Sequence, residues 1–405
     1  MAKVVFLSLA ATTVIMAGGY NIPEQSMNAA GLATAYVANA HGADAAYYNP
    51  ANMVFNEGKG SFEIDLTYIH LTATEADGVY ASAIPYSIKS EKENFIIPTF
   101  HYVSPAVNDF RFGLSLIAPG GLSKNWNDAP ATWNGKEFTL QTYEINPTVA
   151  YKINDQLSVA VGLRSLYSSG KIVIDASTSP DTSANAKYDM DAKGFHWGYN
   201  LALSYKPTEE LSLATTYRSN IDMKVDGDAT LTYPTAFGGA TVSDSASTST
   251  PLPAVLRLAT AYTFKETTTV EFVYERNYWS KYSQLDITFA NNPALNISSA
   301  KNWDDTSTYR LGVTHKYDSV WTVLAGLTYD ESPIPEDTLS FDLPGSDGMI
   351  YSFGTRYAVS KDIEVGASFA YLDADEISVS QATAITGSFD NTAVYLFTIG
   401  MEYKF

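Results

Sequence analysis

The stretch YLFTIGMEYKF at residues 395–405 decides the fold of this chain, because its side chains alternate in character from one position to the next. One parity is entirely apolar or aromatic and comprises Tyr395, Phe397, Ile399, Met401, Tyr403 and Phe405. Thr398, Glu402 and Lys404 belong to the other parity. Successive side chains of a β-strand point to opposite faces, so the pattern predicts a strand with one apolar and one polar face. This strand ends on an aromatic residue, Phe405.

The same two-residue rhythm recurs from Lys59 onward. Its apolar parity includes Phe62, Ile64, Leu66 and Tyr68, then Phe110, Phe112, Leu114 and Leu116, then Phe195, Trp197, Tyr199, Leu201, Leu203 and Tyr205, and later Tyr309, Leu311, Val313, His315 and Tyr317. Polar residues such as Glu63, Asp65 and Thr67 lie between them. A soluble β-sandwich also alternates, but it would not need an outward face so consistently made of Leu, Phe and Tyr.

The connections between these strands fall into two classes that alternate along the chain. The short ones are Ser104–Asp109, Asn154–Gln156, Lys206–Glu210, Lys265–Thr267, Asp318–Ser319 and Ser360–Asp362. The long ones are near 73–94, 119–138, 172–193, 225–252, 281–305, 331–348 and 381–391. Six short and seven long connections join fourteen strands. The sequence therefore predicts an all-β fold, a 14-stranded antiparallel transmembrane β-barrel with short periplasmic turns and long outer loops.

Tyrosines near the predicted periplasmic strand ends support this orientation. They are Tyr102, Tyr151, Tyr205, Tyr262, Tyr317, Tyr357 and Tyr403. Amphipathic rings at one depth form the aromatic girdle of an outer-membrane barrel. The alternative is that Tyr is simply common in strands.

Composition excludes several other classes of protein. The chain has no cysteine, a net charge of -19 and a pI near 4.6. Disulfides and thiolate metal sites are therefore excluded, and nucleic-acid binding by phosphate neutralisation is disfavoured. Neither a Gly-x-Ser-x-Gly elbow nor a His-Glu-x-x-His pair occurs, although a Ser/His pair could still form across strands. We expect no enzyme activity, no cofactor, no metal site and no nucleic-acid partner.

The N-terminal 58 residues do not follow the strand pattern. Residues 1–17 resemble a cleaved export signal, with Lys3 before the apolar run VVFLSLAATTVIMA at 4–17 and small residues ahead of Gly18. Residues 18–58 are Ala-rich and interrupted by Gly and Pro, and we expect them to fold as a plug, or hatch, in the lumen. A periplasmic extension is the alternative. Residues 59–405 form the predicted barrel.

Several motifs occur in order along this pattern. They are GLATAY at 31–36 leading to Asp44 and Asn49-Pro50-Ala51, APGGL at 118–122, LPAVLRL at 252–258 with Trp279-Ser280 downstream, and YDESPIP at 329–335 with Leu343-Pro344. In this set the chain resembles the FadL/TodX (OMPP1) family of outer-membrane channels for long-chain fatty acids and aromatic hydrocarbons. The resemblance implies fourteen strands, a hatch in the lumen, and a gap beside a kinked third strand through which substrate leaves sideways into the membrane.

The resemblance also implies roles for particular residues. Asn49, Pro50 and Ala51 would belong to the hatch and its gate, although an Asn-Pro pair is also an ordinary turn. The third strand would be Phe110–Ala118, where Gly113 could permit the kink. Pro98 in the preceding strand removes a ladder donor and could weaken pairing nearby, or it could sit at a tolerated bulge.

Basic side chains are candidates for binding a substrate carboxylate. In the stretch that matches the family's interior pocket the chain keeps Lys171 but has Ser169 where a fatty acid channel would be expected to carry Arg. Four arginines have inward-facing parity, Arg164, Arg257, Arg310 and Arg356. A lone charge in a lumen usually finds a partner, so pairing with inward acids such as Glu144 or Glu364 is the competing interpretation.

The outer loops contain apolar residues that could capture a hydrophobic solute, or that could merely pack the loops and anchor them at the interface. They are Leu122, Trp126, Trp133, Phe138, Trp279, Tyr282 and Trp303. Acidic residues in 73–94, 301–305 and 330–347 are interpreted as solvated loop surface. Cation bridges to lipopolysaccharide are the alternative.

The sequence thus predicts an outer-membrane channel for passive uptake of hydrophobic compounds such as long-chain fatty acids, alkanes or aromatic hydrocarbons. Its expected partners are that substrate, outer-membrane lipid and lipopolysaccharide, and the barrel-assembly machinery through Phe405, and we expect a monomer. A general porin for hydrophilic solutes and a structural or adhesive surface barrel are the alternatives.

Overall fold

The computed structural model describes residues 18–56, 59–180, 186–234, 238–382 and 385–405. The predicted export signal at 1–17 lies outside the described residues. No helix in the described part of the chain is long and apolar enough to cross a membrane.

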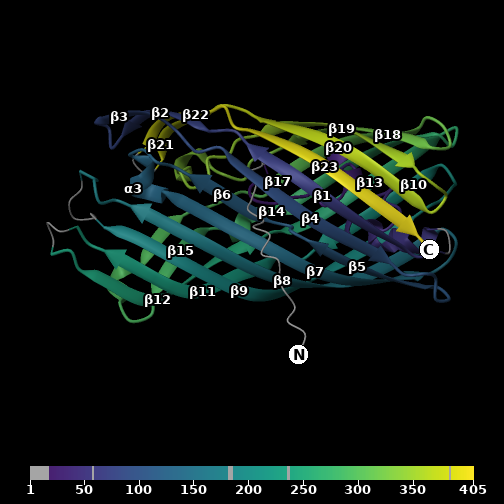
Figure 1. Cartoon of the computed structure of the whole chain (residues 1–405), viewed down its shortest axis with the longest axis horizontal. Helices are drawn as coiled ribbons and strands as arrows, with labels where there is room; N and C mark the ends of the chain where they lie inside the picture. The colour runs from purple at the N-terminus through teal and green to yellow at the C-terminus, as the bar shows by residue number, and fades with distance from the viewer. Residues whose placement is uncertain (1–17, 57–58, 181–185, 235–237, 383–384) are drawn as a thin grey trace.

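The strands pair in an antiparallel ring that closes on itself, as predicted (Figure 1). Nine of the fourteen barrel strands in the described residues are single segments, namely β1 (Ser61–Leu71), β4 (Glu93–Val103), β7 (Glu137–Lys152), β8 (Leu157–Asp175), β9 (Lys187–Tyr205), β18 (Trp321–Asp330), β19 (Gly348–Ala358), β20 (Ile363–Ala374) and β23 (Ala393–Lys404). The other five are each broken into two segments: β5 (Phe110–Ile117) with β6 (Gly121–Asn125), β10 (Leu211–Arg218) with β11 (Ile221–Thr232), β12 (Thr241–Leu252) with β13 (Ala254–Phe264), β14 (Thr268–Tyr278) with β15 (Gln284–Phe289), and β16 (Ile297–Ala300) with β17 (Thr306–Lys316). The first and last strands close the ring, because β1 pairs with β23 along its whole length, from Ser61 opposite Lys404 to Leu71 opposite Val394.

The two faces of the wall are divided as the alternation predicted. On β9, Phe195 and Trp197 are 57% and 60% exposed on the outside. On β1, Glu63 and Asp65 are buried on the inside. The outward band is the surface that lipid covers, and the inward band meets the hatch. The tyrosines of the predicted girdle are exposed at the short-turn ends, apart from Tyr102, which is half-buried beside Phe405.

The long-loop end contains more regular structure than predicted. Within the predicted connection 172–193, β8 runs on to Asp175 and β9 begins at Lys187. Most of the predicted connection 225–252 is the β11–β12 hairpin. In β11 the alternation is the reverse of that in the rest of the wall, because Met223, Val225 and Leu231 are buried whereas Lys224 and Asp226 are exposed on the outside. Its partner β12 is rich in Ser and Thr and alternates only weakly.

The outer loops build a cap over this end of the barrel (Figure 1). A four-stranded sheet joins β2 (Glu75–Tyr80), β3 (Ile84–Lys89), β21 (Ile377–Ala382) and β22 (Ile385–Asp390). Short helices complete the loops: α3 (Ala131–Gly135), η4 (Trp279–Lys281), η5 (Pro293–Leu295) and η6 (Glu336–Thr338). Phe341 lies in the core of the cap against Tyr86, Trp126 and Phe389.

The N-terminal segment fills the barrel. It contains α1 (Met27–Gly31), α2 (Ala45–Tyr48) and the 3-10 helix η1 (Pro50–Phe55), and between Gly18 and Asn56 only His41 is exposed. Ser26 caps α1, because its hydroxyl accepts a hydrogen bond from the Ala29 N–H. We refer to residues 18–56 as the hatch.

Wall carboxylates hold the hatch by its backbone. The Glu271 carboxylate accepts hydrogen bonds from the N–H groups of Val37, Ala38 and Asn39 at 2.6, 2.6 and 3.1 Å. Glu402 accepts one from Ala43 at 3.0 Å. Through these bonds the two glutamates tie the irregular hatch to β14 and β23.

Candidate functional site

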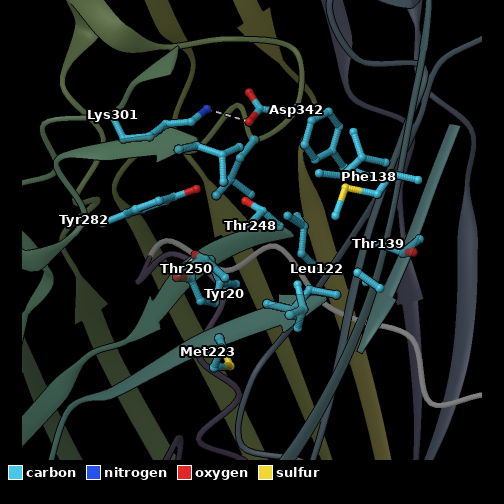
Figure 2. Close-up of a pocket in the computed structure, with 18 of the residues that line it drawn as sticks. Tyr20, Leu122, Phe138, Thr139, Met223, Thr248, Thr250, Tyr282, Lys301 and Asp342 are labelled. Carbon is cyan, nitrogen blue, oxygen red and sulfur yellow. Dashed lines mark hydrogen bonds and ion pairs between the residues drawn. The ribbon is translucent and has the colours of Figure 1, made fainter. Parts of the chain in front are cut away.

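An apolar pocket lies at the long-loop end of the lumen, beneath the cap (Figure 2). Its empty space, including its open mouth, is about 700 Å³. The apolar lining comes from six barrel strands and from the loops, and includes Leu122, Phe138, Leu140, Ile172, Met190, Met223, Val225, Leu285, Trp303 and Leu343. Such a surface favours a hydrophobic solute, because transfer from water gains about 25 cal/mol per Å² buried.

One ion pair lies in the pocket wall. The Lys301 ammonium lies 2.6 Å from the Asp342 carboxylate, and both side chains are buried. Burial by itself lowers the pKa of Lys301, but the neighbouring carboxylate outweighs it and the pKa is raised. Burial likewise raises the pKa of Asp342, and Lys301 and the Ser340 hydroxyl more than offset it, so the pKa is lowered. Both groups are therefore charged and mutually neutralised.

Hydroxyl groups supply the rest of the polar lining. Tyr20 from the hatch bonds to Thr250 Oγ1 at 2.6 Å and to the carbonyl of Pro251. The Thr248 hydroxyl is buried in the lining and makes no hydrogen bond with any described residue. Figure 2 places Thr248 between the Lys301–Asp342 pair and Tyr20.

The hatch forms the floor of this pocket and reaches the third barrel strand. Tyr20 lines the pocket and its carbonyl accepts a hydrogen bond from Gly121 at 2.8 Å. The N–H of Ile22 donates to the Pro119 carbonyl at 3.0 Å. The Gln25 side chain bonds both backbone groups of Ala118, at 2.8 and 2.9 Å. On the side that faces β4 the chain from 118 to 121 is therefore bonded to the hatch, while Gly121 remains paired with Gln141 of β7.

The barrel ladder is interrupted beside this segment. On its other edge β4 pairs with β1 along its whole length, from Glu93 to Val103. Toward the third strand it pairs only from Phe100 to Val103, opposite Gly113–Leu116 of β5. In the described residues no strand pairs with Glu93–Thr99 on this side, and β6 pairs with β7. A gap in the hydrogen bonding thus lies between β4 and the segment that turns inward.

The predicted position of the kink is wrong. Gly113 is fully in the ladder, opposite Val103 on one side and Thr148 on the other. It is a glycine because the hatch packs against it: a Cβ there would lie 2.7 Å from Met53 Sδ. The chain turns inward at Ala118–Gly120 instead. Pro98 lies on the unpaired stretch of β4, just beyond the last paired residue, Phe100.

The Asn49-Pro50-Ala51 motif is buried at the hatch centre. The Asn49 side chain donates to the Val37 carbonyl and to Ser204 Oγ of the wall, at 2.9 and 2.8 Å. Pro50 begins η1, and the carbonyl of Ala51 accepts a bond from Ser158 at 2.7 Å. The motif therefore links the hatch to β8 and β9.

The inward arginines are paired with acids, as the competing interpretation held. Arg164 lies 2.9 Å from Glu144, which also bonds Arg218. Arg257 and Arg310 share Glu275. Arg356 contacts Glu364, Glu402 and Glu63 at 2.6, 3.0 and 3.4 Å. Arg164, Arg218 and Arg257 line a second cavity, together with Ile22 and Pro119. Each is ion-paired, but two arginines share each glutamate, so the pairs do not cancel all of the positive charge.

Lys171 does not reach the apolar pocket. It has the outward parity of Tyr167, lies 2.7 Å from Glu137, and lines a recess on the outer flank with Asp191 and Asp228. The structure therefore places it away from the interior.

The predicted loop residues divide into two groups. Leu122, Phe138, Tyr282 and Trp303 line the pocket. Trp126 is buried in the cap, with its Nε1 donating to the Phe341 carbonyl at 2.8 Å. Trp133 bonds Thr178 at a more exposed site, and Trp279 packs behind Trp303 and Tyr20. These three tryptophans support the pocket or the cap and do not line the cavity.

The polar residues that line the pocket were missed by the sequence reasoning, apart from Tyr282; Thr248, Lys301 and Asp342 are among them. The acidic stretch 330–347 was interpreted as solvated surface, and for the buried Asp342 that interpretation is wrong. No local pattern marks these residues, since strand β12 and two separate loops bring them together.

Two Ser/His pairs do form across strands. His101 lies 3.0 Å from Ser115 and 2.8 Å from the Gln25 carbonyl, and His196 lies 2.9 Å from Ser168. Neither pair lines the two cavities described above. In the described residues no group of three or more His, Asp or Glu is placed to hold a metal ion.

The sequence is similar to those of known outer-membrane proteins. Residues 8–405 match the model of the family described as outer membrane protein transport protein (OMPP1/FadL/TodX). The chain is 26% identical over 324 residues to the long-chain fatty acid transport protein of Shigella flexneri, covering 70% of this chain and 72% of the relative. It is 22% identical to outer membrane protein P1 of Haemophilus influenzae, covering 98% and 99%.

Solved structures share the fold. A FadL homologue from Pseudomonas aeruginosa superposes with a TM-score of 0.83 at 20% identity, covering 95% of this chain and 99% of that one. The toluene transporter TodX of Pseudomonas putida gives a TM-score of 0.73 at 16% identity, covering 94% and 99%.

Proposed function

The chain belongs to the outer membrane transport protein family OMPP1/FadL/TodX, and on that premise we propose that it carries small hydrophobic molecules across the outer membrane. Solute enters from the loop end, occupies the pocket above Tyr20, and leaves sideways through the gap beside β4. The names of the relatives, which include transporters of long-chain fatty acids and of toluene, support a hydrophobic cargo.

One observation carries the proposal. The floor of the apolar pocket and the inward turn of the third strand are joined by the hydrogen bond between Tyr20 and Gly121. A solute that contacts Tyr20 therefore lies next to the inward turn, which faces the unpaired stretch of β4. Release there delivers an apolar molecule into lipid without return to water, which is the favourable direction for it.

The filled lumen argues against a general porin. An aqueous channel needs an open path, whereas the hatch is buried apart from His41 and a few half-buried residues, and it is tied to the wall by Glu271 and Glu402. Asn49, Pro50 and Ala51 would act as the part of the hatch that must shift during passage. In this proposal the chain is a channel without catalytic activity.

Export and assembly complete the proposal. An export signal at 1–17 would be removed, and the exposed aromatic Phe405 would contact the barrel-assembly machinery. Lipopolysaccharide would surround the outer flank, where Lys171 and Asp191 lie in a recess.

A charge placed in the pocket should abolish passage. We expect Leu122→Asp to lower uptake of a radiolabelled alkane by about tenfold or more, because a buried carboxylate without a partner strongly disfavours an apolar ligand. Leu122→Met is the matched control and should transport normally. Uptake is measured in cells that lack other channels of this family, with surface levels of folded barrel matched. Undiminished uptake by Leu122→Asp would contradict the assignment of the pocket.

A further inference from the structure

The pocket described above contains an ion pair that is internally satisfied and a hydroxyl that is not. Lys301 reaches Asp342 at 2.6 Å and Ser340 at 3.4 Å, and the second oxygen of Asp342 bonds the Ser340 hydroxyl. The Thr248 hydroxyl, by contrast, has no partner among the described residues. The ion pair therefore disfavours a charged ligand, whereas the hydroxyl favours a ligand with a hydrogen-bonding atom.

The ion pair disfavours an anion. A carboxylate entering the pocket would have to displace Asp342 from Lys301, or else be buried as an extra negative charge beside an existing one. No other cation lines this cavity in the described part of the chain. The wall arginines that line the second cavity, Arg164 and Arg257, are held by Glu144 and Glu275.

The free hydroxyl favours a ligand with one polar atom. Thr248 Oγ1 can donate or accept a hydrogen bond, and its residue belongs to a lining that is otherwise largely apolar. The oxygen is enclosed, so a ligand atom meets it when the side chain rotates about χ1 toward the cavity. A buried polar atom without a partner is unfavourable, so a ligand oxygen that reaches it gains a bond which a pure hydrocarbon cannot make.

We propose that this pocket selects uncharged hydrophobic molecules carrying one hydrogen-bonding oxygen, such as a long-chain alcohol, a ketone or a phenol. Thr248 binds the oxygen, and Asp342 excludes carboxylates by keeping Lys301 neutralised. This inference rests on the proposed function, because it takes the pocket to be the site that substrate occupies. It makes Thr248 and Asp342 the residues that set specificity.

The test uses three probes of equal chain length: dodecane, lauryl alcohol and laurate. Their binding to the purified full chain in lipid nanodiscs is measured by displacement of radiolabelled lauryl alcohol at about pH 8, where the free carboxylate is ionised. The wild type should bind the alcohol about tenfold more tightly than dodecane or laurate, one buried hydrogen bond being worth roughly that factor.

Two substitutions then separate the two features. Thr248→Val should weaken alcohol binding by about tenfold and leave dodecane unchanged, and Thr248→Ser should restore the alcohol. Asp342→Asn frees Lys301 and should strengthen laurate by about tenfold or more with little effect on the alcohol. Preferred binding of laurate by the wild type, or no response of the alcohol to Thr248→Val, overturns the inference. Equal binding of all three probes overturns it but leaves the proposed function standing, whereas binding of none refutes both.

Gly18, at the start of the hatch, supports a second and independent inference. The backbone nitrogen of Gly18 lies 2.8 Å from Asp330 Oδ2, and the other carboxylate oxygen accepts a bond from Thr308 at 2.6 Å. Asp330 is buried, and the nearby cation that acts on it, Arg310, is itself bonded to Glu275. A Cβ on Gly18 would lie 2.8 Å from the same carboxylate oxygen, so a larger residue there would have to displace the carboxylate.

We infer that Ala17–Gly18 is the processing site and that the new α-ammonium forms an ion pair with Asp330. An export-pathway peptidase would hydrolyse this peptide bond with water. The carboxylate of Ala17 leaves with the leader, and the nitrogen of Gly18 takes up protons to become an ammonium. The resulting ion pair fastens the start of the hatch beside Tyr20.

Mass spectrometry of the purified chain tests this directly. We expect the mature protein to begin at Gly18 and its α-amine to resist acylation by an amine-reactive reagent while the barrel is folded. Asp330→Asn should make that amine react about tenfold faster or more, because one charged hydrogen bond no longer holds it in place. Asp362→Asn, which removes an acid from the exposed pair with Lys59, should not change its reactivity. A different mature start, or equal reactivity in the wild type and Asp330→Asn, overturns the inference.

Discussion

Uptake of an alkane should fall to the level of cells without the protein when a large, removable group is attached at Ile97→Cys. Ile97 faces inward on the stretch of β4 that lacks a partner, and it packs in one cluster with Ile22 of the hatch and Ala118 of the inward turn. A bulky adduct there would fill the proposed exit. The chain has no cysteine of its own, so a disulfide-forming reagent modifies only the introduced residue.

The size of the adduct and a second position provide the controls. A methyl-sized adduct should leave uptake nearly unchanged, and reduction with dithiothreitol should restore it after the large one. Thr67→Cys lies directly opposite Ile97 in the ladder and also faces inward, but β1 is paired on both edges. The same adduct should inhibit less there. Equal inhibition at both positions would mean that the reagent merely crowds the lumen, and lateral exit would lose its support.

Removal of the hatch should turn a nearly silent barrel into an ion-conducting one. Deleting residues 19–55 keeps the inferred processing site and leaves Glu271 and Glu402 facing a lumen that water can enter. We expect the single-channel conductance in planar bilayers to rise by about tenfold or more, since a barrel of this width without filling side chains encloses an aqueous path.

Folding of the deletion variant must be verified, because the hatch contributes most of the contacts inside the wall. Heat-modifiable migration in electrophoresis reports the closed barrel. Lys59→Ala, which removes only an exposed ion pair near the short-turn end, is the control and should conduct as little as the wild type. Free ion flow through the intact protein would instead favour a porin.

The wall of the barrel could be predicted because its two faces meet different solvents. Lipid outside and a packed, polar interior force the period of two that runs from Phe195 to Tyr205, and the two classes of connection fix the strand count. The same reasoning failed around 225–252, because β11 turns its apolar side chains inward and its charged ones outward, the reverse of the lipid-facing wall, and β12 is mostly Ser and Thr.

The interior chemistry could be predicted only in part. Pairing of Arg164 with Glu144 followed from the unfavourable burial of a lone charge. The inward turn occurs at Ala118-Pro119-Gly120, but the sequence analysis assigned it to Gly113. A glycine inside a strand can indicate either a bend or a close neighbour. At Gly113 the close neighbour is the hatch, whose position cannot be predicted from the sequence alone. No sequence pattern indicates a binding role for Thr248, because that role depends on its hydroxyl lacking a hydrogen-bond partner in the folded structure.

The route of the solute is the central claim, and photoaffinity labelling measures it most directly. Lauryl alcohol carrying a diazirine would be equilibrated with the folded protein in nanodiscs, irradiated, and its adducts mapped by mass spectrometry. We expect adducts on the pocket around Leu122 and Thr248, and on the edges of the gap at Ile97 and Ala118. Adducts that continue down the lumen to Phe55 and the short-turn end, with none at the gap, would contradict it.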